Sequence, residues 1–331
     1  MVKASIIVPT KNRANSLAST IRSLVAQDFP VQEYEVLIVD NGSTDETHNV
    51  AENMIANYQS HRIRYIYELE PGLLSGRHRG AFESNGEILI FVDDDIEAES
   101  GWLPAIIDAF NDPKVHLVGG PSLPNFEVEP QDWVRNYWIK KNGRVVCGPL
   151  SVSYNGDKKI EIDPCYVWGL NFAIRKNTLF DIGGFHPDCI SKNLQHFQGD
   201  GETGLTSKAK EKKLKAIYAP DATVYHNIPI ERLTVKGFEE RNYYQGVCDS
   251  FTQIRKNGGI TNISLPQYCP IKTLPSHLSA YEQYKQIIYQ RIQNSYVDGF
   301  RFHQEAVRKS DKLLEWVLRD NYLFDYTLPK I

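Results

Sequence analysis

The sequence predicts an α/β fold with a mostly parallel central sheet flanked by helices. Up to residue 120, short continuous apolar runs alternate with segments whose apolar residues recur every three or four positions. Continuous apolar runs are typical of strands that are buried on both faces, and helices between such strands connect parallel neighbours. The length of 331 residues suits one large domain or two ordinary ones.

The expected elements follow one another in the order of such a fold. Strands are expected at residues 3–9, 35–39, 62–67 and 87–92, with helices at residues 15–27, 45–58 and 75–84 between them. Prolines break up residues 113–164, where we expect short strands and loops. A strand at 166–175, a helix at 203–213 and a strand at 214–219 follow. From about residue 233, helical spacing and many tyrosines predict a helical extension with a proline-rich connector at 265–275. We expect residues 233–331 to pack on a domain formed by residues 1–232.

Composition and charge exclude several classes of protein. The 37 basic and 41 acidic residues leave a formal charge of −4, so no basic coat and no nucleic-acid partner are expected. No apolar run approaches the roughly 20 residues that span a bilayer. The first residues lack the apolar region of a signal peptide. The five cysteines contain no Cys-x-x-Cys pair, which indicates free thiols in a reducing compartment. We therefore expect a cytoplasmic protein.

The sharpest candidate site is the run Asp93-Asp94-Asp95 after the predicted strand 87–92. A run of aspartates can be a solvated turn, because Asp is common in turns. Adjacent carboxylates repel one another, however, and ligands of parallel sheets bind at the carboxyl ends of the strands. The position therefore favours a hard divalent cation, Mg²⁺ or Mn²⁺, held by one or two carboxylates together with water and substrate phosphates.

Two further segments allow two interpretations each. Asp40 ends the predicted strand 35–39, where it could accept the imide N–H of a uracil ring or cap the turn that begins at Asn41. The run Gly76-Arg77-His78-Arg79-Gly80 opens the helix before the aspartates. Its basic side chains could meet a diphosphate, although an exposed basic helix face is the commoner case.

Asp200 and Glu202 lie among three glycines just before the predicted helix 203–213. Asp200 could cap that helix, or it could be a general base, because glycines let a substrate approach closely. His226 follows the strand-like residues 222–225 and gains a role only if the fold brings it near Asp95. Trp168 is more often a core residue than a platform for a sugar.

Several common nucleotide and hydrolase motifs are missing. No Gly-x-Gly-x-x-Gly follows the first strand, and neither the P-loop pattern nor Gly-x-Ser-x-Gly occurs. The missing motifs therefore disfavour dinucleotide-binding enzymes, P-loop nucleoside triphosphatases and the common serine hydrolases.

Taken in order, these segments resemble the family-2 glycosyltransferases, which have the A-type, Rossmann-like nucleotide-sugar fold. The pieces are Ser5–Thr10 with Asn12-Arg13, Val39–Asp45, Gly76–Gly80, Phe91–Asp95, Trp168–Phe185 and Asp200-x-Glu202. Each piece is weak alone, but the ordered set, which reaches at least His226, is specific. The chain departs from the family pattern at His78, where Asn is more frequent, and at Gly199, where an acidic residue often stands.

The resemblance implies an inverting transferase that uses a nucleoside-diphosphate sugar, with a UDP-sugar as the expected donor and Mn²⁺ or Mg²⁺ as the cofactor. Residues 1–232 would be the nucleotide-sugar-binding and catalytic domain. The implied nucleotide-sugar residues are Pro9, Thr10, Arg13, Asp40, Arg77, Asp93 and Asp94. Asp95 would ligate the metal, and His226 would join it at the metal or the diphosphate.

The resemblance also implies a site for the acceptor. Asp200 would be the general base, with Glu202 as the next candidate, and Trp168 would meet the acceptor. The acceptor could be a saccharide, a lipid-linked sugar or a protein side chain, and a lipid-linked one would bring the protein to the inner face of a membrane. Two other hypotheses stay open: a Mg²⁺-dependent nucleotidyltransferase or phosphatase, and a non-catalytic nucleotide-sugar binding module.

Overall fold

The computed structural model describes residues 1–141, 143–261, 263–270 and 278–330. In the first part, the strands are β1 (Ala4–Thr10), β2 (Tyr34–Asp40), β3 (Ile63–Tyr67), β4 (Ile88–Val92), β5 (Ile96–Ala98), β6 (Val115–Gly119) and β7 (Ser122–Phe126). The helices among them are α1 (Ala14–Val25), α2 (Thr47–Asn57), α3 (Leu73–Glu83) and α4 (Trp102–Ala109). The expected alternation of strands and helices is thus present.

The middle of the chain consists of shorter elements. Its strands are β8 (Ile139–Lys141), β9 (Arg144–Cys147), β10 (Val152–Tyr154), β11 (Ile160–Ile162), β12 (Asn171–Arg175), β13 (Lys215–Tyr218) and β14 (Val224–Ile228). Its α-helices are α5 (Lys176–Ile182) and α6 (Glu202–Glu211). Its 3₁₀ turns are η1 (Val134–Tyr137), η2 (Gly148–Leu150), η3 (Pro164–Tyr166), η4 (Lys192–Phe197) and η5 (Ile230–Leu233).

The main sheet confirms the predicted α/β architecture. Among the described residues it has eight strands in the order β11-β13-β6-β12-β4-β1-β2-β3. Strands β1, β2, β3 and β4 are parallel neighbours, and β12 runs antiparallel between β4 and β6. The strands β1 and β2 are buried along their whole length, which explains their continuous apolar sequence. Their last residues, Thr10 and Asp40, are paired, so the polar segments that follow meet at one edge.

A second sheet, which the sequence did not reveal, lies beside the main one. Its order is β5-β14-β7-β10-β9-β8. His226 lies inside β14, whereas we expected it after a strand that ended at residue 225. The strand expected at 166–175 begins only at Asn171, because Asp163 and Pro164 set up the turn η3 with Asp163 accepting the N–H of Cys165.

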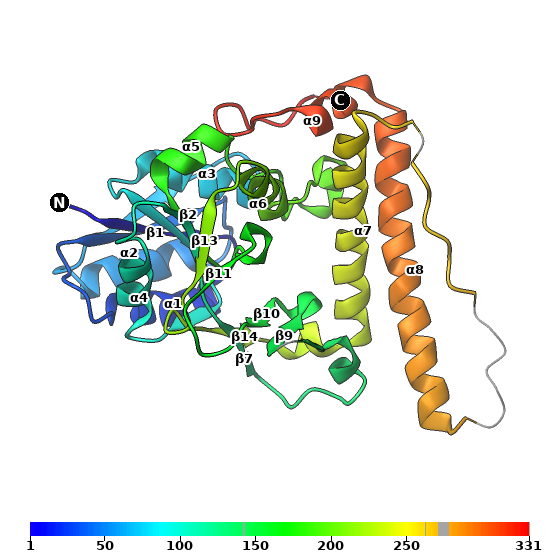
Figure 1. Ribbon diagram of the computed structural model, residues 1–331, viewed down its shortest axis with the longest axis horizontal. Coiled ribbons are helices and arrows are strands. Elements are labelled where there is room, and N and C mark those ends of the chain that lie inside the picture. Colours follow the sequence, from blue (N-terminus) through cyan, green and yellow to red (C-terminus); the bar gives the residue numbers. More distant parts are fainter. Residues whose placement is uncertain (142, 262, 271–277, 331) are drawn as a thin grey trace.

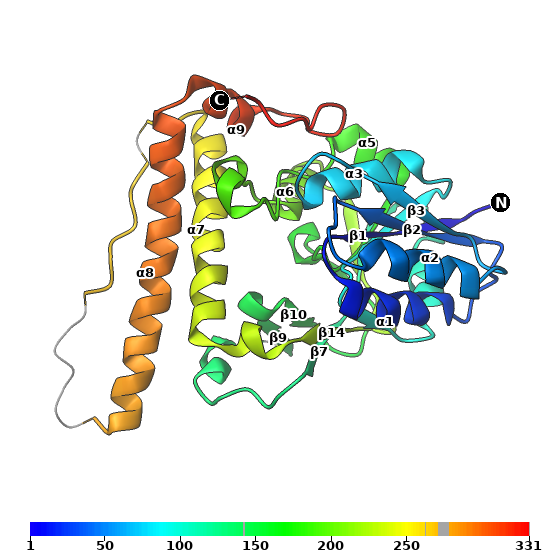
Figure 2. The same ribbon diagram turned by 180° about the vertical axis from the view of Figure 1, so that it is seen from behind.

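The C-terminal part consists of α7 (Val235–Asn257), α8 (Ala280–Arg308) and α9 (Asp311–Leu318). Helices α7 and α8 stand side by side beside the sheets, and α9 lies near the C-terminus (Figures 1 and 2). Gly246 and Gly299 lie at their crossing, where an added Cβ would come within 2.0 Å of a backbone oxygen of the opposite helix. Part of the expected connector, residues 271–275, lies outside the described residues.

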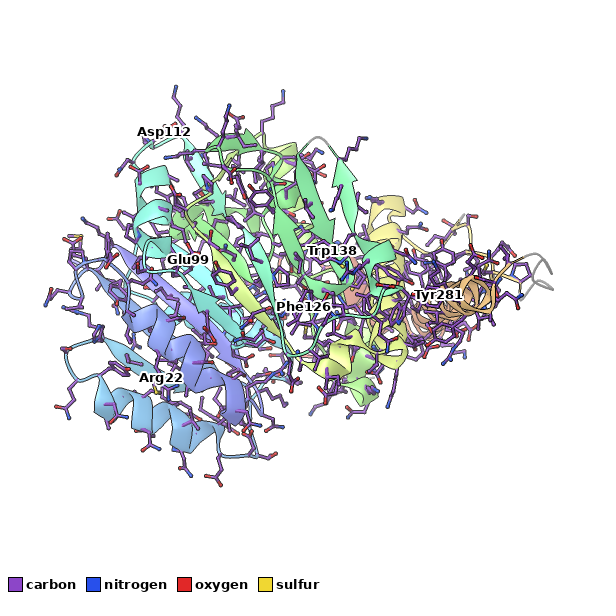
Figure 3. All side chains as sticks on the ribbon, turned by 90° about the horizontal axis from the view of Figure 1, so that it is seen from below. Arg22, Glu99, Asp112, Phe126, Trp138 and Tyr281 are labelled. Atoms are coloured by element: carbon purple, nitrogen blue, oxygen red, sulfur yellow. The ribbon has the colours of Figure 1, made fainter. Side chains whose placement is uncertain are left out.

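These helices share the core of the sheet domain. The indole N–H of Trp316 donates to the carbonyl of Phe197, and Arg255 donates to the carbonyls of Val317 and Arg319. A separate apolar cluster joins α8, through Ile288 and Ile292, to residues of the second sheet and η1. Figure 3 shows Phe126 and Trp138 of this region on the side of the molecule that faces Tyr281 of α8. None of the described helices combines the length and apolar character that crossing a membrane requires.

Candidate active site

The three consecutive aspartates follow β4 directly, between the carboxyl end of β1 and the second sheet. Asp93 keeps 36% of its side chain exposed, whereas Asp94 and Asp95 are almost buried. Burial and then the neighbouring Asp95 charge raise the pKa of Asp94 to about 7. Packing in the apolar core does not explain three consecutive carboxylates, because they repel one another. We therefore expect a positively charged ligand at this edge.

Asp95 and His226 form the most specific geometry in the cluster. The Nδ1 of His226 lies 2.9 Å from the carbonyl oxygen of Leu150, so Nδ1 carries the hydrogen and Nε2 presents a lone pair. The Nε2 atom lies 3.6 Å from Oδ1 of Asp95, and this buried Oδ1 has no hydrogen-bond partner. A carboxylate oxygen and an imidazole nitrogen that face each other in this way suit a divalent cation.

Such a cation would need further ligands from outside the protein. Among the described residues, no group of three His, Cys, Asp or Glu side chains is arranged to hold a metal. Asp95 and His226 therefore fit a site that is completed by water and substrate phosphates. This is the kind of site that the aspartate run predicts.

Two arginines complete this side of the cluster. Arg13 lies 3.5 Å from Asp94 and 3.9 Å from Asp95. Arg232 donates to Nε2 of His226 at 3.0 Å, so it must give up this bond before Nε2 can bind a cation. Burial by itself would raise the pKa of Asp95, but the contact with His226 and the charges of Arg13 and Arg232 lower it. Asp95 is therefore ionised at neutral pH, as a metal ligand must be.

Thr10 and Asp40 lie together where β1 and β2 end. The hydroxyl of Thr10 is buried near Asp94, whose pKa it lowers, but it has no partner within full hydrogen-bond distance and can turn to a ligand. Asp40 is 1% exposed, and its two oxygens accept the N–H of Ser43 and the hydroxyl of Tyr65, each at 2.8 Å. Asp40 thus caps the turn, as one of the two interpretations predicts. A contact between Asp40 and a nucleoside stays a prediction. Pro9 packs against α3, 3.0 Å from where a Cβ on Gly76 would lie.

The segment Gly76–Gly80 does not form the exposed basic helix face that one interpretation expected. Not all of its basic side chains are placed to meet a diphosphate, as the other interpretation expected. Gly76 and Gly80 let α3 lie directly on β1, because a Cβ on Gly80 would come within 2.4 Å of Ile7. Arg79 forms an exposed ion pair with Glu83. His78 is fully buried and accepts the N–H of Phe185 at 2.9 Å, and burial lowers its pKa to about 3. His78 thus takes the role of a neutral polar acceptor in place of the more frequent Asn.

Arg77 joins the aspartate run to the segment around Glu202. Its side chain is 3% exposed and lies 3.8 Å from Asp93, 3.5 Å from Glu202 and 4.9 Å from the centre of the Phe185 ring. Glu202 Oε1 also accepts the N–H of Gly169 at 3.2 Å, and a Cβ on Gly169 would clash with Arg77. Trp168 precedes this glycine and is partly exposed. Glu202, Arg77 and Asp93 therefore form one group of charged side chains.

Asp200 has different surroundings from Glu202. Its Oδ1 lies 2.6 Å from Nδ1 of His186, its Oδ2 accepts the hydroxyl of Thr252 at 2.6 Å, and its side chain is 6% exposed. Burial would raise the pKa of Asp200, but the contacts with His186 and Thr252 lower it. Asp200 thus ties the loop before α6 to α7.

The neighbouring glycine explains the second departure from the family pattern. A Cβ on Gly199 would come within 2.9 Å of the carbonyl oxygen of Pro187 and 3.0 Å of the Phe251 ring. An acidic side chain has no room there.

Sequence reasoning missed three residues of this region: Asp188, Arg232 and Arg241. Asp188 lies in the loop after α5, Arg232 in η5 and Arg241 on α7. The pKa of Asp188 is raised by burial and by the charge of Glu202, and lowered by Arg77 and Arg241. In the sequence, each of these three residues is a single charged residue in a segment without a recognisable motif. That pattern is too common to indicate a functional residue.

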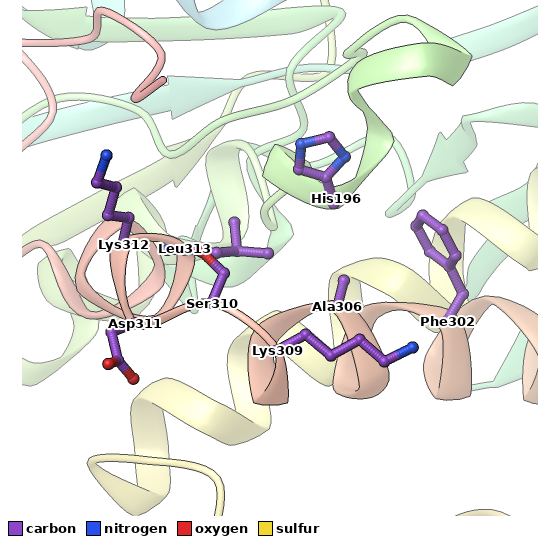
Figure 4. A pocket seen from close by; sticks show the side chains of 8 residues that line it. All are labelled: His196, Phe302, Ala306, Lys309, Ser310, Asp311, Lys312 and Leu313. Atoms are coloured by element: carbon purple, nitrogen blue, oxygen red, sulfur yellow. Dashed lines mark hydrogen bonds between the residues drawn. The ribbon is translucent and has the colours of Figure 1, made fainter. Parts of the chain in front are cut away.

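A pocket of about 740 Å³ lies elsewhere, between α8, α9 and η4. Figure 4 shows its lining, which includes His196, Phe302, Lys309 and Lys312. It contains none of the residues that the sequence predicts for chemistry, so we place the active site at the aspartate run.

Comparison with known proteins agrees with the fold. The family model described as glycosyl transferase family 2 matches residues 5–182, more than half of the chain. The chain belongs to glycosyltransferase family 2, as the sequence motifs predicted, and it is a glycosyltransferase by its relatives.

Curated relatives carry the names of glycosyltransferases. Glycosyltransferase AglE of Haloferax volcanii is 27% identical over 227 residues, which cover 67% of this chain and 66% of that protein. A GalNAc(5)-diNAcBac-PP-undecaprenol beta-1,3-glucosyltransferase of Campylobacter jejuni is 33% identical over 121 residues, 36% of this chain and 38% of that one. The chain thus matches just under two thirds of the first relative and about two fifths of the second.

A solved structure confirms the A-type glycosyltransferase fold. It is a mannosyltransferase from Pyrobaculum calidifontis in complex with GDP-Man and Mn²⁺. The TM-score is 0.54 at 17% identity, and the match covers 93% of this chain and 75% of that one. At this identity the likeness establishes the fold alone.

Proposed function

We propose that the protein is an inverting glycosyltransferase that moves a sugar from a nucleoside-diphosphate donor, a UDP-sugar, to an acceptor hydroxyl with the help of a divalent cation. One observation carries the proposal: Asp95 Oδ1 and His226 Nε2 face each other at the edge where β1, β2 and β4 end. This is the edge at which parallel α/β sheets bind nucleotides. Residues 1–232 would provide the catalytic domain, and residues 233–331 the extension that supports it.

The nucleotide would lie along the ends of β1 and β2. Thr10 offers an unpaired buried hydroxyl, and Pro9 and Asp40 flank it at the same edge. Arg13, half exposed, is placed to meet the phosphates because it already faces Asp94 and Asp95. Asp93 and Asp94 would face the ribose and the donor sugar.

Asp95 and His226 would hold the cation, Mn²⁺ or Mg²⁺. When bound, the cation supplies Lewis-acid stabilisation of the negative charge on the departing diphosphate. The mannosyltransferase from Pyrobaculum calidifontis was solved in complex with Mn²⁺, which supports this choice of cofactor class. Arg232, which contacts His226, adds a second positive charge on the same side.

The reaction needs one carboxylate to take the proton of the acceptor hydroxyl. The hydroxyl oxygen forms a bond to the anomeric carbon while the bond from that carbon to the diphosphate oxygen breaks, and the bonding pair leaves with the diphosphate. A single displacement inverts the configuration and forms no covalent enzyme intermediate, in contrast to retaining hydrolases.

Of the two carboxylates that the sequence offers, Glu202 has the better position for this role. Both carboxylates have partners on each oxygen, Gly169 and Arg77 for Glu202 and His186 and Thr252 for Asp200, and each oxygen keeps a further lone pair. The difference lies in access, because the side chain of Glu202 is 27% exposed and that of Asp200 only 6%. We therefore propose Glu202 as the base, with Asp200 as the alternative that the sequence pattern favours.

The acceptor would approach past Trp168, which adjoins Glu202 through Gly169. The names of the relatives suggest a saccharide or lipid-linked acceptor. A lipid-linked acceptor would bring the protein to the inner face of a membrane as a peripheral protein.

A screen of UDP-, GDP-, CDP- and dTDP-sugars tests this function. The assay measures release of the nucleoside diphosphate and sugar transfer to saccharide and lipid-linked acceptors, with Mn²⁺ and with EDTA. Release of UDP with transfer of the sugar in Mn²⁺ is the expected result. Release of pyrophosphate or inorganic phosphate would indicate a nucleotidyltransferase or phosphatase instead.

A further inference from the structure

Arg144, the first residue of β9, presents a guanidinium group that donates to no described residue. Its Cζ lies 3.5 Å from the centre of the Tyr166 ring, so the two side chains stack. Its Nε is buried without a hydrogen-bond partner among the described residues, and the residue is partly exposed. Stacking fixes the plane of the guanidinium and leaves its outer N–H groups to another partner. Because an unpaired buried donor costs free energy, we expect a ligand at this side chain.

Lys141 adds a second positive charge beside Arg144. The two residues are directly opposite each other in the hairpin of β8 and β9. Like charges at such positions destabilise a hairpin. No carboxylate of the described residues forms an ion pair with either of them, and Asp163, which caps the turn that contains Tyr166, is already paired with Lys210. An anion bound by Lys141 and Arg144 would remove the repulsion.

Tyr166 connects this pair of charges to the acceptor side of the active site. It ends η3, and Gly169, three residues further on, donates its N–H to Oε1 of Glu202, the proposed base. Three residues of chain span at most about 11 Å. Trp168, past which the acceptor would approach, lies on the same segment. A ligand bound at Arg144 is therefore on the side from which the acceptor would reach Glu202.

The same strand keeps Arg144 apart from the proposed cation site. Strands β9 and β10 are antiparallel, and the turn between them contains Leu150, whose carbonyl orients His226. This turn follows Cys147, at the end of β9 that is away from Arg144. The three residues from Arg144 to Cys147 correspond to about 10 Å of strand. A phosphate at Arg144 would therefore differ from the donor diphosphate that the cation would hold.

We propose that Arg144 and Lys141 bind a phosphate group of the acceptor, and that the acceptor is a saccharide with a phosphate or diphosphate ester. The inference rests on the proposed function and narrows its class of acceptor. A guanidinium can bind two oxygens of one phosphate through parallel N–H bonds, and a lysine adds a point charge. A soluble sugar phosphate and a lipid-linked saccharide both present this chemistry, whereas an unmodified protein side chain does not.

Matched acceptors test this inference. Glucose 1-phosphate is compared with the methyl glucoside of the same anomeric configuration, and N-acetylglucosamine 1-phosphate with its methyl glycoside. Calorimetry measures the dissociation constants in saturating UDP and Mg²⁺, which fill the donor site. In the wild type, the phosphate of at least one pair should bind about tenfold or more tightly than the methyl glycoside.

Farnesyl diphosphate esters of the same two sugars identify the source of the phosphate. An ester that binds more tightly than the 1-phosphate indicates a lipid-linked acceptor. An ester that does not bind more tightly indicates a soluble sugar phosphate. Both outcomes support the proposed phosphate contact.

Variants assign the preference to the two basic residues. In Arg144→Gln, which removes the charge, the preference for the phosphate should shrink about fivefold or more, while UDP should bind as in the wild type. Arg144→Lys keeps the charge but not the planar fork, so it should retain part of the preference. Lys141→Gln takes the place of Arg144→Gln if that variant does not fold. Lys114→Gln is the matched control and should change nothing, because this exposed lysine precedes β6 at the opposite edge of the main sheet.

Three results would overturn the inference. The first is a wild type that binds UDP but binds neither sugar phosphate more tightly than its methyl glycoside. The second is a folded Arg144→Gln protein, or in its place a folded Lys141→Gln protein, that keeps the full preference. The third is an Arg144→Gln protein that loses affinity for UDP as well, which would assign Arg144 to the donor diphosphate. A wild type that binds no UDP would instead refute the proposed function, and this inference with it.

Discussion

Oδ1 of Asp200 lies 2.6 Å from Nδ1 of His186, and both side chains are almost inaccessible to solvent. Thr252 of α7 donates to the other oxygen of Asp200. This arrangement joins the loop before α6 to the helical extension.

We expect Asp200→Ala to destabilise the protein. It removes two hydrogen bonds to a buried charged group, each worth about 1.5–3 kcal/mol, so the free energy of unfolding should fall by at least about 2 kcal/mol. Urea unfolding measures this change, and Thr252→Val, which removes one of the two bonds, should cost less. An unchanged unfolding midpoint in Asp200→Ala would show that the contact with His186 contributes nothing.

The same pair makes stability depend on pH. His186 and Asp200 both have a lowered pKa in the folded protein, from ordinary values of 6.5 and 3.8. The unfolded chain therefore binds protons first as the pH falls, and stability present at neutral pH is lost in two steps. The first loss should begin below pH 6.5 and the second below pH 3.8. Because burial also lowers the pKa of His78 and His303, His186→Phe should reduce the first loss without abolishing it. A flat stability profile between about pH 7 and pH 5 would contradict this expectation.

Turnover should separate the two candidate bases. Glu202→Gln keeps the shape of the side chain but cannot take a proton, so transfer to the acceptor should fall by roughly two to four orders of magnitude. The affinity for UDP and Mn²⁺ should stay near that of the wild type. Asp200→Asn should reduce turnover far less, measured under conditions where chemistry limits the rate. The opposite ranking of the two variants would return the role to Asp200.

Cation and nucleotide should bind together. Because Asp95 and His226 supply only two protein ligands, calorimetry should show tight binding of UDP in Mn²⁺ and much weaker binding in EDTA. Asp95→Asn should remove the advantage of Mn²⁺, whereas Asp28→Asn, at an exposed aspartate just after α1, should keep it. Equal affinity for UDP in Mn²⁺ and in EDTA, with full activity in EDTA, would exclude the metal role.

Asp40 tests the choice of nucleoside. If it also accepts the uracil imide proton, UDP should outcompete GDP and CDP, and Asp40→Ala should weaken UDP binding about tenfold, from the loss of a charge-assisted hydrogen bond. Tyr65→Phe is the matched variant, because it removes the partner of Asp40 and leaves the carboxylate in place. Unchanged UDP affinity in a folded Asp40→Ala protein would leave Asp40 with its turn-capping role alone.

The main sheet could be predicted well because parallel strands that are buried on both faces have continuous apolar sequences. The predicted strand 87–92 became β4 at Ile88–Val92, for example, with the aspartates directly after it. The second sheet escaped prediction because strands such as β8 and β10 have only three residues each, too few to show a period.

The site was predictable where residues adjoin in sequence, and not where the fold alone unites them. The Asp93–Asp95 run was visible at once. The orientation of His226, by contrast, depends on the carbonyl of Leu150, 76 positions away. One partner of Asp200 is Thr252, in a helix that matched no known pattern. Contacts between residues far apart in the chain decide whether Asp200 or Glu202 faces Arg77. The local sequence around Asp200 cannot reveal such contacts.

The close crossing of α7 and α8 at Gly246 and Gly299 has an evolutionary consequence. Two glycines, and not the length of the intervening chain, set the register of the two helices, because any side chain there would strike the opposite backbone. The contact between Thr252 and Asp200 is therefore anchored by the crossing itself. An insertion after Cys269, whose backbone exchanges two hydrogen bonds with Asn294 of α8, would lengthen the molecule at its outer end and leave the chemistry at the sheet edge unaltered.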